Sequence, residues 1–198
     1  MTTRNSVTIG AQEWKIRNLN GRTFRNGDPV PLVTSAEAWA EAADMGLPAC
    51  CFFEHIHWIG RSYGKLYNWY AVNDPRGLAP EGWHIPSDEE WEQLVSFLGG
   101  KEVAGNKLKS TKEWEEPVGT NESRFYALPG CCRDQHGEFR GIEDDNNWWK
   151  SWGYWWTSTG NDEKSAWCRS MHSSGSYVYR DAFLRGYGFS VRCVKEAR

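Results

Sequence analysis

The clearest pattern of apolar and polar positions lies between residues 87 and 100. Four apolar residues there follow the helical spacing i, i+3, i+4 and i+7: Trp91, Leu94, Val95 and Leu98. That spacing places them on one side of a helix. Ser87 and Glu90 have the capping-box spacing, and the glycines at 99 and 100 favour a helix end. We therefore expect a helix that begins after Ser87 and buries its apolar side against a sheet.

Similar signals predict a second helix in the N-terminal part of the chain. Thr34 and Glu37 have the capping-box spacing, and Trp39 and Ala43 follow as apolar positions on one side. Gly46 supplies the residue type that commonly ends a helix. We expect this helix and the one after Ser87 to be the two main helices of the protein.

Strands are predicted where apolar and polar residues alternate with a period of two. Near the N-terminus, residues 6–10 and 12–17 alternate on either side of a glycine turn. In the C-terminal third, alternation begins at Ala166, a turn is expected at residues 173–175, and a closing strand is expected at residues 188–194. Short strands of this kind are typical of antiparallel sheets rather than of repeated strand–helix units.

These elements predict a single α+β domain over residues 1–198, with two main helices around a small, mostly antiparallel sheet. The apolar side of the helix after Ser87 should pack on a sheet that contains Phe189, Val191 and Val194. Residues 63–73 are rich in aromatic side chains and are expected to be buried, as extended chain or a helical turn. Further short strands are expected within residues 125–130 and 138–141.

Composition narrows the classes of function. The chain has 198 residues with 13 Trp, 8 Tyr and 8 Phe, so the predicted core is rich in aromatic rings. A net charge of -3 shows no basic excess, and we therefore expect no nucleic-acid partner. No apolar run is long enough to cross a membrane, so no direct membrane insertion is expected. The first residues lack the apolar stretch of a signal peptide.

The cysteines do not have the spacing of a disulfide framework or of a zinc site. Two of the 6 cysteines are adjacent at 50 and 51, two are adjacent at 131 and 132, and the others stand alone. Metal binding by Cys50, Cys51, His55 and His57 is one interpretation, and half-buried thiols with loop histidines are the interpretation that we favour. No cofactor is predicted.

Acidic residues occur in two groups. Asp88, Glu89 and Glu90 are explained by the helix N-terminus, where negative charge is favourable. The segment 143–147 has oxygen ligands suited to Ca²⁺ but lacks the EF-hand spacing, so a solvated loop is the alternative. No phosphate-binding loop, Ser/His/Asp arrangement or His-Glu-x-x-His motif is present, and we predict no catalytic residue.

Five motifs carry a resemblance to a known family. In chain order they are Gly64-Lys-Leu-Tyr-Asn-Trp-Tyr70, Trp83-His-Ile-Pro-Ser-Asp-Glu-Glu-Trp91, Asn121-Glu-Ser-Arg-Phe-Tyr-Ala-Leu-Pro-Gly130, Tyr154-Trp-Trp-Thr-Ser-Thr159 and Gly188-Phe-Ser-Val-Arg-Cys-Val194. Together they resemble the Fibrobacter succinogenes major paralogous domain family, from about Thr8 to the last strand. The resemblance implies a C-type lectin-like fold of the formylglycine-generating-enzyme type. It also implies display at a cell surface or on a virion, with an unknown ligand.

Some members of this family are variable proteins of diversity-generating retroelements, which mutate adenines in selected codons. Asn codons altered in this way yield small, polar and aromatic residues but not Trp, Met, Lys, Glu or Gln. Residues 155–194 contain a set of predicted outward or loop positions that all belong to the accessible types. These predicted ligand-binding residues are Cys168, Ser170, His172, Ser173, Ser174, Ser176, Tyr177, Tyr179, Asp181, Ala182, Phe183, Leu184, Gly186 and Tyr187.

The residues between these positions are predicted to form the scaffold: Trp167, Arg169, Met171, Val178 and Arg180. We expect Cys168, Ser170 and His172 to share one solvent-facing side of a strand, because side chains two apart point the same way. The predicted function is a binding module for a protein or glycan ligand, and not an enzyme. A plain hairpin with solvent-facing aromatic residues is the simpler alternative.

A thiol oxidase with a degenerate site is the alternative from a different functional class. The oxidases that share the implied fold use two closely spaced cysteines to bind copper, because paired thiolates favour Cu(I). Here Cys168 has no cysteine nearby in the sequence, and Cys193 lies on the predicted closing strand, where burial is expected. The residues therefore favour the binding module.

Overall fold

The computed structural model describes residues 5–115, 119–140 and 151–197. The helices are α1 (Ala36–Asp44), the 3₁₀ turn η1 (Phe53–His55), α2 (His57–Tyr63), α3 (Trp69–Val72), α4 (Asp88–Phe97) and α5 (Ala104–Leu108). The strands are β1 (Ser6–Ile9), β2 (Gln12–Lys15), β3 (Cys50–Cys51), β4 (Leu66–Tyr67), β5 (Cys132–Arg133), β6 (Phe139–Arg140), β7 (Trp152–Gly160), β8 (Ser165–His172), β9 (Val178–Leu184) and β10 (Val194–Glu196). The fold is mixed α and β, with several small antiparallel sheets.

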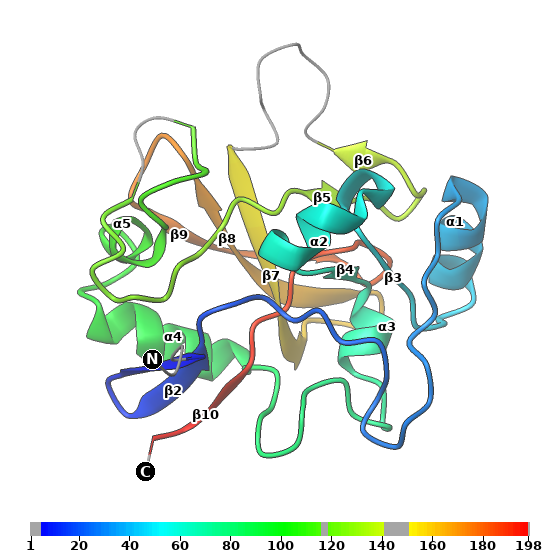
Figure 1. The fold of residues 1–198 in the computed structure, drawn as a ribbon, viewed down its shortest axis with the longest axis horizontal. Coiled ribbons are helices and arrows are strands. Elements are labelled where there is room, and N and C mark those ends of the chain that lie inside the picture. The colour runs from blue at the N-terminus through cyan, green and yellow to red at the C-terminus, as the bar shows by residue number, and fades with distance from the viewer. Residues whose placement is uncertain (1–4, 116–118, 141–150, 198) are drawn as a thin grey trace.

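Two three-stranded sheets dominate the architecture (Figure 1). One has the strand order β1-β2-β10 and joins both ends of the chain, and the other has the order β7-β8-β9. Helix α4 lies between them, because its apolar side chains share one buried cluster with Trp14 and Val194 of the first sheet and with Trp155 and Met171 of the second. The strand pairs β3-β4 and β5-β6 are shorter.

The helix predicted after Ser87 has the expected caps and packing. The Glu90 N–H donates to Ser87 Oγ at 3.1 Å, and the Ser87 N–H donates to Glu90 Oε2 at 2.8 Å. The apolar stripe of α4 is buried, and it contacts Val194 as predicted. Phe189 and Val191 belong to a different buried cluster, so that part of the packing prediction is wrong.

The second main helix begins one residue later than predicted. Its N-cap is Ser35 rather than Thr34, since the Ala38 N–H donates to Ser35 Oγ at 3.1 Å. Both residues are good caps, and the local spacing alone did not separate them. Gly46 follows the helix with a φ of 67°, a left-handed conformation that glycine adopts without strain.

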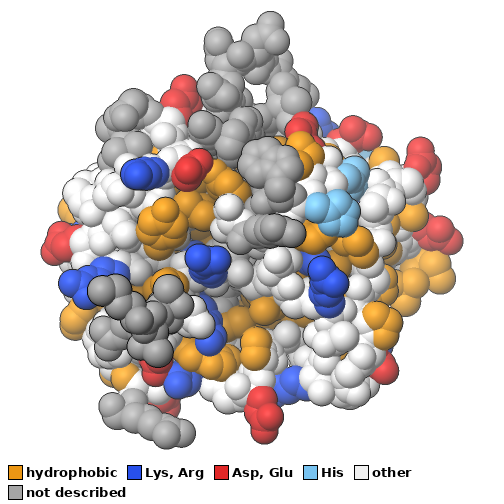
Figure 2. All heavy atoms as spheres, viewed as in Figure 1, with side chains coloured by type: hydrophobic (Ala, Val, Ile, Leu, Met, Phe, Trp, Pro, Cys, Tyr) orange, Lys and Arg blue, Asp and Glu red, His pale blue; other side chains and the backbone are white. Residues whose placement is uncertain are grey.

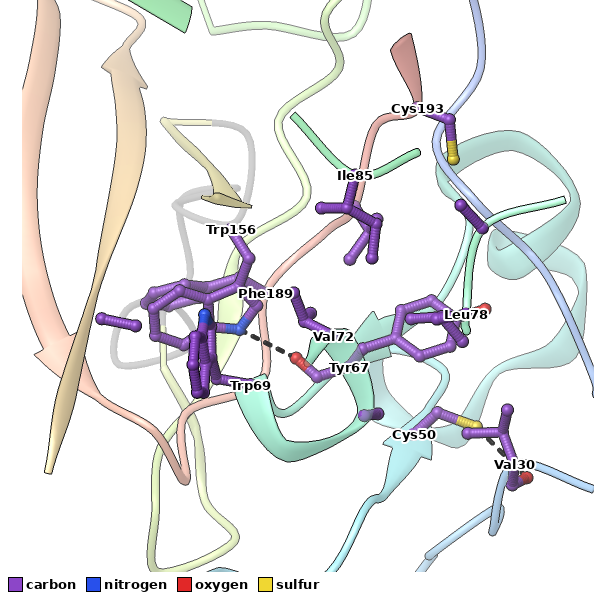
Figure 3. Packing of buried hydrophobic residues seen from close by; sticks show 14 of the residues in the cluster. Val30, Cys50, Tyr67, Trp69, Val72, Leu78, Ile85, Trp156, Phe189 and Cys193 are labelled. Atoms are coloured by element: carbon purple, nitrogen blue, oxygen red, sulfur yellow. Dashed lines mark hydrogen bonds between the residues drawn. The ribbon is translucent and has the colours of Figure 1, made fainter. Parts of the chain in front are cut away.

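A second buried cluster lies beneath the β7-β8-β9 sheet (Figure 3). Trp156, Trp69 and Phe189 pack together there, and the Trp156 indole donates to the Tyr67 carbonyl at 3.0 Å. The aromatic run 63–73 supplies Tyr67 from β4 and Trp69 from α3, so it is both extended and helical. The prediction that this run is buried is confirmed for Tyr67 and Trp69.

The predicted hairpin is present, but the closing strand is shorter than expected. Strands β8 and β9 pair antiparallel through residues 165–171 and 178–184. Residues 188–190 make isolated bridges to Arg133, Tyr67 and Trp155, and regular strand structure begins only at Val194. Residues 188–190 therefore connect three separate segments and do not form a continuous strand of one sheet. Within the predicted strand piece 125–130, only Ala127 forms a bridge.

On the side shown in Figure 2, basic and acidic side chains are interspersed rather than gathered into a patch of one sign. Among the helices of the described residues, none is long and apolar enough to span a membrane.

Candidate functional site: an aromatic face on the C-terminal sheet

The strand register sorts the side chains of the C-terminal sheet into two faces. Tyr154 lies opposite Ser170, and Ser170 lies opposite Tyr179. Because side chains alternate along each strand, one face collects rings from both outer strands. We call this surface the aromatic face, and it consists of Trp152, Tyr154, His172, Tyr177, Tyr179, Asp181 and Phe183.

The central strand contributes small side chains to this face. Ala166, Cys168 and Ser170 lie between the rings of β7 and those of β9. The rings meet above them, since the ring centroids of Trp152 and Tyr179 are 5.7 Å apart and those of Tyr154 and Phe183 are 5.9 Å apart. Aromatic pairs are favourable at these separations.

This arrangement overturns one expectation. Cys168 and Ser170 were predicted to be solvent-facing together with His172, but their exposed fractions are 0% and 1%. Their direction on the sheet is as predicted, but both are covered. The rings of Trp152 and Tyr179 meet beside Ser170, and Cys168 belongs to the buried cluster of Trp156 and Phe189. His172 is half-buried at the end of β8, where its ring lies 4.6 Å from that of Trp152. The predicted residues are therefore on one face, but not all of them are accessible.

The other predicted binding residues divide by exposure. Those that are exposed are Ser174, Tyr179, Asp181, Ala182 and Leu184. Those that are half-buried are Ser176, Tyr177, Phe183 and Tyr187. Ser173 and Gly186 are buried, so their predicted outward placement is also wrong. The Ser173 N–H bonds the Ser151 carbonyl at 2.8 Å, and Gly186 approaches Ala43 so closely that a Cβ would clash.

Ala182 and Leu184 are exposed on the opposite side of β9 from the aromatic face. That side belongs mainly to α4. Arg169 is buried there and donates to Asp88 Oδ1 at 2.7 Å and to Glu92 Oε2 at 3.2 Å. These contacts agree with the predicted scaffold role of Arg169.

Asp181 is the exposed carboxylate in the middle of the aromatic face. On its own strand it lies between Tyr179 and Phe183. It accepts a hydrogen bond from the Ser170 hydroxyl at 3.3 Å. Burial raises the pKa of the Tyr154 hydroxyl, and the negative charge of Asp181 acts in the same direction. The face therefore combines ring surfaces with one negative charge.

A buried lysine fixes the turn at the end of this face. Lys109 donates from Nζ to the carbonyls of His172 at 3.1 Å, Ser173 at 2.9 Å and Gly175 at 2.8 Å. Its exposed fraction is 1%, and burial lowers the pKa of Lys109 to about 8. Sequence reasoning missed this role, because Lys109 follows a short segment with no pattern that separates it from a surface lysine.

The His172 ring is part of the same turn. The Ser174 N–H donates to His172 Nδ1 at 3.1 Å, so this nitrogen acts as an acceptor and carries no proton. Burial lowers the pKa of His172, and the positive charge of Lys109 lowers it further. The turn is therefore built around a neutral imidazole.

The cysteines are buried and protonated. Burial raises the pKa of Cys50 to about 11 and that of Cys193 to about 12, and it raises the pKa of Cys168 well above its ordinary value. The interpretation of Cys50 and Cys51 as buried thiols is confirmed, although they are fully rather than half buried. Within the described part of the chain, no three His, Cys, Asp or Glu side chains are grouped to hold a metal ion.

The acidic segment 143–147, which was considered for Ca²⁺, lies outside the described residues. The candidate site therefore consists of the aromatic face and the turn held by Lys109. Its exposed groups, the ring of Tyr179 and the carboxylate of Asp181, suit recognition through ring surfaces and hydrogen bonds.

Comparison with known proteins gives one match. The family model described as Fibrobacter succinogenes major domain matches residues 7–195, nearly the whole chain. This agrees with the resemblance carried by the five motifs. No curated protein and no solved structure matches the chain.

Proposed function

We propose that this chain, which belongs to the Fibrobacter succinogenes major domain family, is a ligand-binding module whose binding surface is the aromatic face. We further propose that its fold is the C-type lectin-like fold of the formylglycine-generating-enzyme type. The observation that carries the proposal is the row of rings on one side of β7-β8-β9, which ends in the exposed ring of Tyr179. Rigid rings give contact area at low entropic cost, as in antibody binding sites.

The side of the sheet that faces α4 is covered by that helix, so the aromatic face is the side with room for a ligand. Met171 and Val178 point toward α4 and are buried in its cluster. On the aromatic face, the inner rings pack against the buried cluster, since Phe189 stacks on Tyr154 at 5.0 Å. At its outer part, Tyr179 and Asp181 are exposed. Exposed aromatic side chains that are grouped in this way mark interaction sites more often than single exposed residues do.

We propose that the exposed positions of this surface are diversified by a retroelement. Tyr179, Asp181, Ala182 and Leu184 are exposed and belong to the residue types reachable from Asn codons. The test is the DNA beside the gene, where we expect a near-repeat of the codons for residues 155–194 and a reverse transcriptase gene. Absence of both from the complete locus would contradict diversification while leaving the binding proposal intact.

The binding proposal is tested with a variant that removes the accessible groups of the face. Tyr177→Ser, Tyr179→Ser and Asp181→Ser are combined, and the control combines Met45→Ser and Leu47→Ser, which are exposed on and after α1. Wild type and both variants are applied to peptide and glycan arrays. We expect ligands that bind wild type and the control to be lost with the triple variant, while all three proteins unfold at similar temperatures. Equal binding by the triple variant would place the site elsewhere.

No contact among the residues that the structure describes favours the thiol oxidase alternative. Its thiol would have to ionise and reach a substrate, whereas Cys168 is covered by rings and its pKa is raised by burial. Oxygen consumption with a cysteine peptide and added Cu(I) tests this directly. Turnover that is abolished by Cys168→Ser would replace the binding module with the oxidase.

A further inference from the structure

We propose that Asp181 and the rings beside it form a subsite for a cationic group, namely a Lys or Arg side chain of a partner polypeptide. This inference rests on the proposed binding function and adds the chemical class of the ligand. The first observation is that the Asp181 carboxylate has no cationic partner among the described residues.

Asp181 is exposed, and among the described residues its carboxylate accepts a hydrogen bond only from the Ser170 hydroxyl. Within the described part of the chain, no Lys, Arg or His side chain forms an ion pair with it. Nearby acids are paired: Asp134 binds Arg140 at 2.6 Å, and Asp88 binds both Arg169 and Arg180. Asp181 is therefore a free negative charge at the centre of a surface made of rings.

The rings around Asp181 suit a cation as well as the charge does. Tyr179 and Phe183 flank it on β9, and the ring of Tyr179 is exposed. Phe183 is half-buried against Phe189, so Tyr179 is the ring that a cation can reach. The faces of aromatic rings attract Lys and Arg side chains, and a carboxylate beside the ring adds a charge-assisted hydrogen bond. A guanidinium or ammonium placed here would meet both kinds of contact at once.

The same sheet already holds an arginine in this way on its other side. The Arg180 guanidinium lies 3.4 Å from the centre of the Trp167 ring, and its Nε donates to Asp88 Oδ2 at 2.8 Å. In that arrangement, the cation of Arg180 contacts both the Trp167 ring and the Asp88 carboxylate. The aromatic face provides the ring and the carboxylate at Asp181, one residue along the strand, and lacks the cation.

The cations at the margins of the face are already engaged. Arg140, whose charge acts on the margin residue Tyr187, is bound to Asp134. Lys101 lies over the ring of Tyr177 at 5.6 Å. Neither is positioned as the counter-charge of Asp181, so the subsite is left for a group from another molecule.

The test uses two small probes that differ in charge alone: N-acetyl-arginine amide and its neutral isostere N-acetyl-citrulline amide. Binding to the full chain is followed by amide chemical shifts in NMR spectra. We expect the arginine probe to bind weakly and to shift resonances of β9, and we expect the citrulline probe to bind at least about fivefold more weakly. Asp181→Asn should reduce arginine binding by a similar factor.

Asp44→Asn serves as the matched control, because it removes an exposed aspartate on α1 and changes the net charge equally. It should leave arginine binding unchanged. Equal binding of the two probes, no binding of arginine, or equal losses with the two variants would overturn the cationic subsite. If the two probes bind equally and both are lost with Tyr179→Ser, the cationic subsite is overturned but the aromatic face is supported as a binding surface.

Discussion

The rings of Trp152 and Tyr179 meet at 5.7 Å above Ser170, although they come from strands that do not pair with each other. The contact is possible because the side chain between them is small. A larger residue on β8 would separate the rings, and Ser170→Leu should therefore be an overpacking change. We expect it to cost about 1–3 kcal/mol of unfolding free energy, measured by urea denaturation. Ser170→Ala should cost less, and a larger loss with alanine would contradict this explanation.

The contact between these two rings also shows why burial on β8 was not predicted correctly. The alternation from residue 166 onward gave the right face for Cys168 and Ser170, because alternation is a local property. Ser170 is covered by rings from β7 and β9, and Cys168 is covered by the buried cluster of Trp156 and Phe189. No local pattern shows that β7 pairs with β8 in the register that brings these rings to them. Register of this kind depends on contacts distant in sequence.

The elements that were predicted well depend on signals within a few residues. Helix α4 was located because Ser87, Glu90 and the glycines at 99 and 100 specify both of its ends. The N-cap of α1 was misplaced by one residue because Thr34 and Ser35 are both suitable caps. The role of Lys109 was missed because its acceptors lie more than sixty residues away in the chain.

Burial of the α4 stripe gives a stability prediction. Leu94 has an exposed fraction of 0%, and Leu94→Ala should cost about 2–5 kcal/mol of unfolding free energy. Phe97 is on the same helix with an exposed fraction of 65%, so Phe97→Ala should change stability by only about 0.5 kcal/mol. Denaturant titrations of the two variants provide the comparison, and similar losses would show that the helix is packed differently.

Lys109 should matter more for stability than a lysine on the surface. Lys109→Met leaves three carbonyls of the turn without a donor, and we expect a loss of about 1–3 kcal/mol. Lys107→Met is the control, since Lys107 is partly exposed and its ion pair with Glu122 is 3.9 Å long. Amide hydrogen exchange at residues 173–176 should also become faster in Lys109→Met. Unchanged exchange there would show that the turn holds without the lysine.

His172 should make stability depend on pH in mildly acidic solution. The folded state lowers the pKa of His172 from 6.5, since burial and Lys109 outweigh the opposite influence of Glu115. Below pH 6.5 the unfolded chain therefore binds more protons at this site than the folded chain, and stability falls as the pH is lowered. Above 6.5 the contribution is complete. Thermal unfolding of wild type between pH 7.5 and about 5 should show this fall.

His172→Asn tests the assignment of that fall, because the Asn side chain oxygen replaces the acceptor but does not titrate. Its melting temperature should change less than that of wild type over the same range. His55, whose pKa is also lowered by burial, titrates in both proteins and cancels in the comparison. Parallel curves for the two proteins would assign the pH dependence to another group.

The buried thiols should be unreactive until the chain unfolds. All six cysteines are buried thiols, and burial raises the pKa of Cys132 and Cys193 to about 12 each. A thiolate is the reactive form, so an aromatic disulfide reagent should label the native protein slowly at pH 8. Labelling should become fast in denaturant. Rapid native labelling of Cys168 would show that the ring contacts over β8 open readily.

Asp88 pairs with two arginines, and the two pairs should differ in energy. Its bond to Arg169 is buried, whereas Arg180 is exposed. Asp88→Asn leaves the Arg169 charge with less compensation, and we expect a loss of about 3 kcal/mol, near the lower end of the range for broken buried pairs. Arg180→Ala removes an exposed pair and should cost less than about 1 kcal/mol.

Adding Arg169→Met to Asp88→Asn should recover much of the loss, because the uncompensated buried charge is then gone. Denaturant titration of all variants measures these unfolding free energies. If the double variant is less stable than Asp88→Asn alone, Arg169 stabilises the sheet by packing rather than by charge.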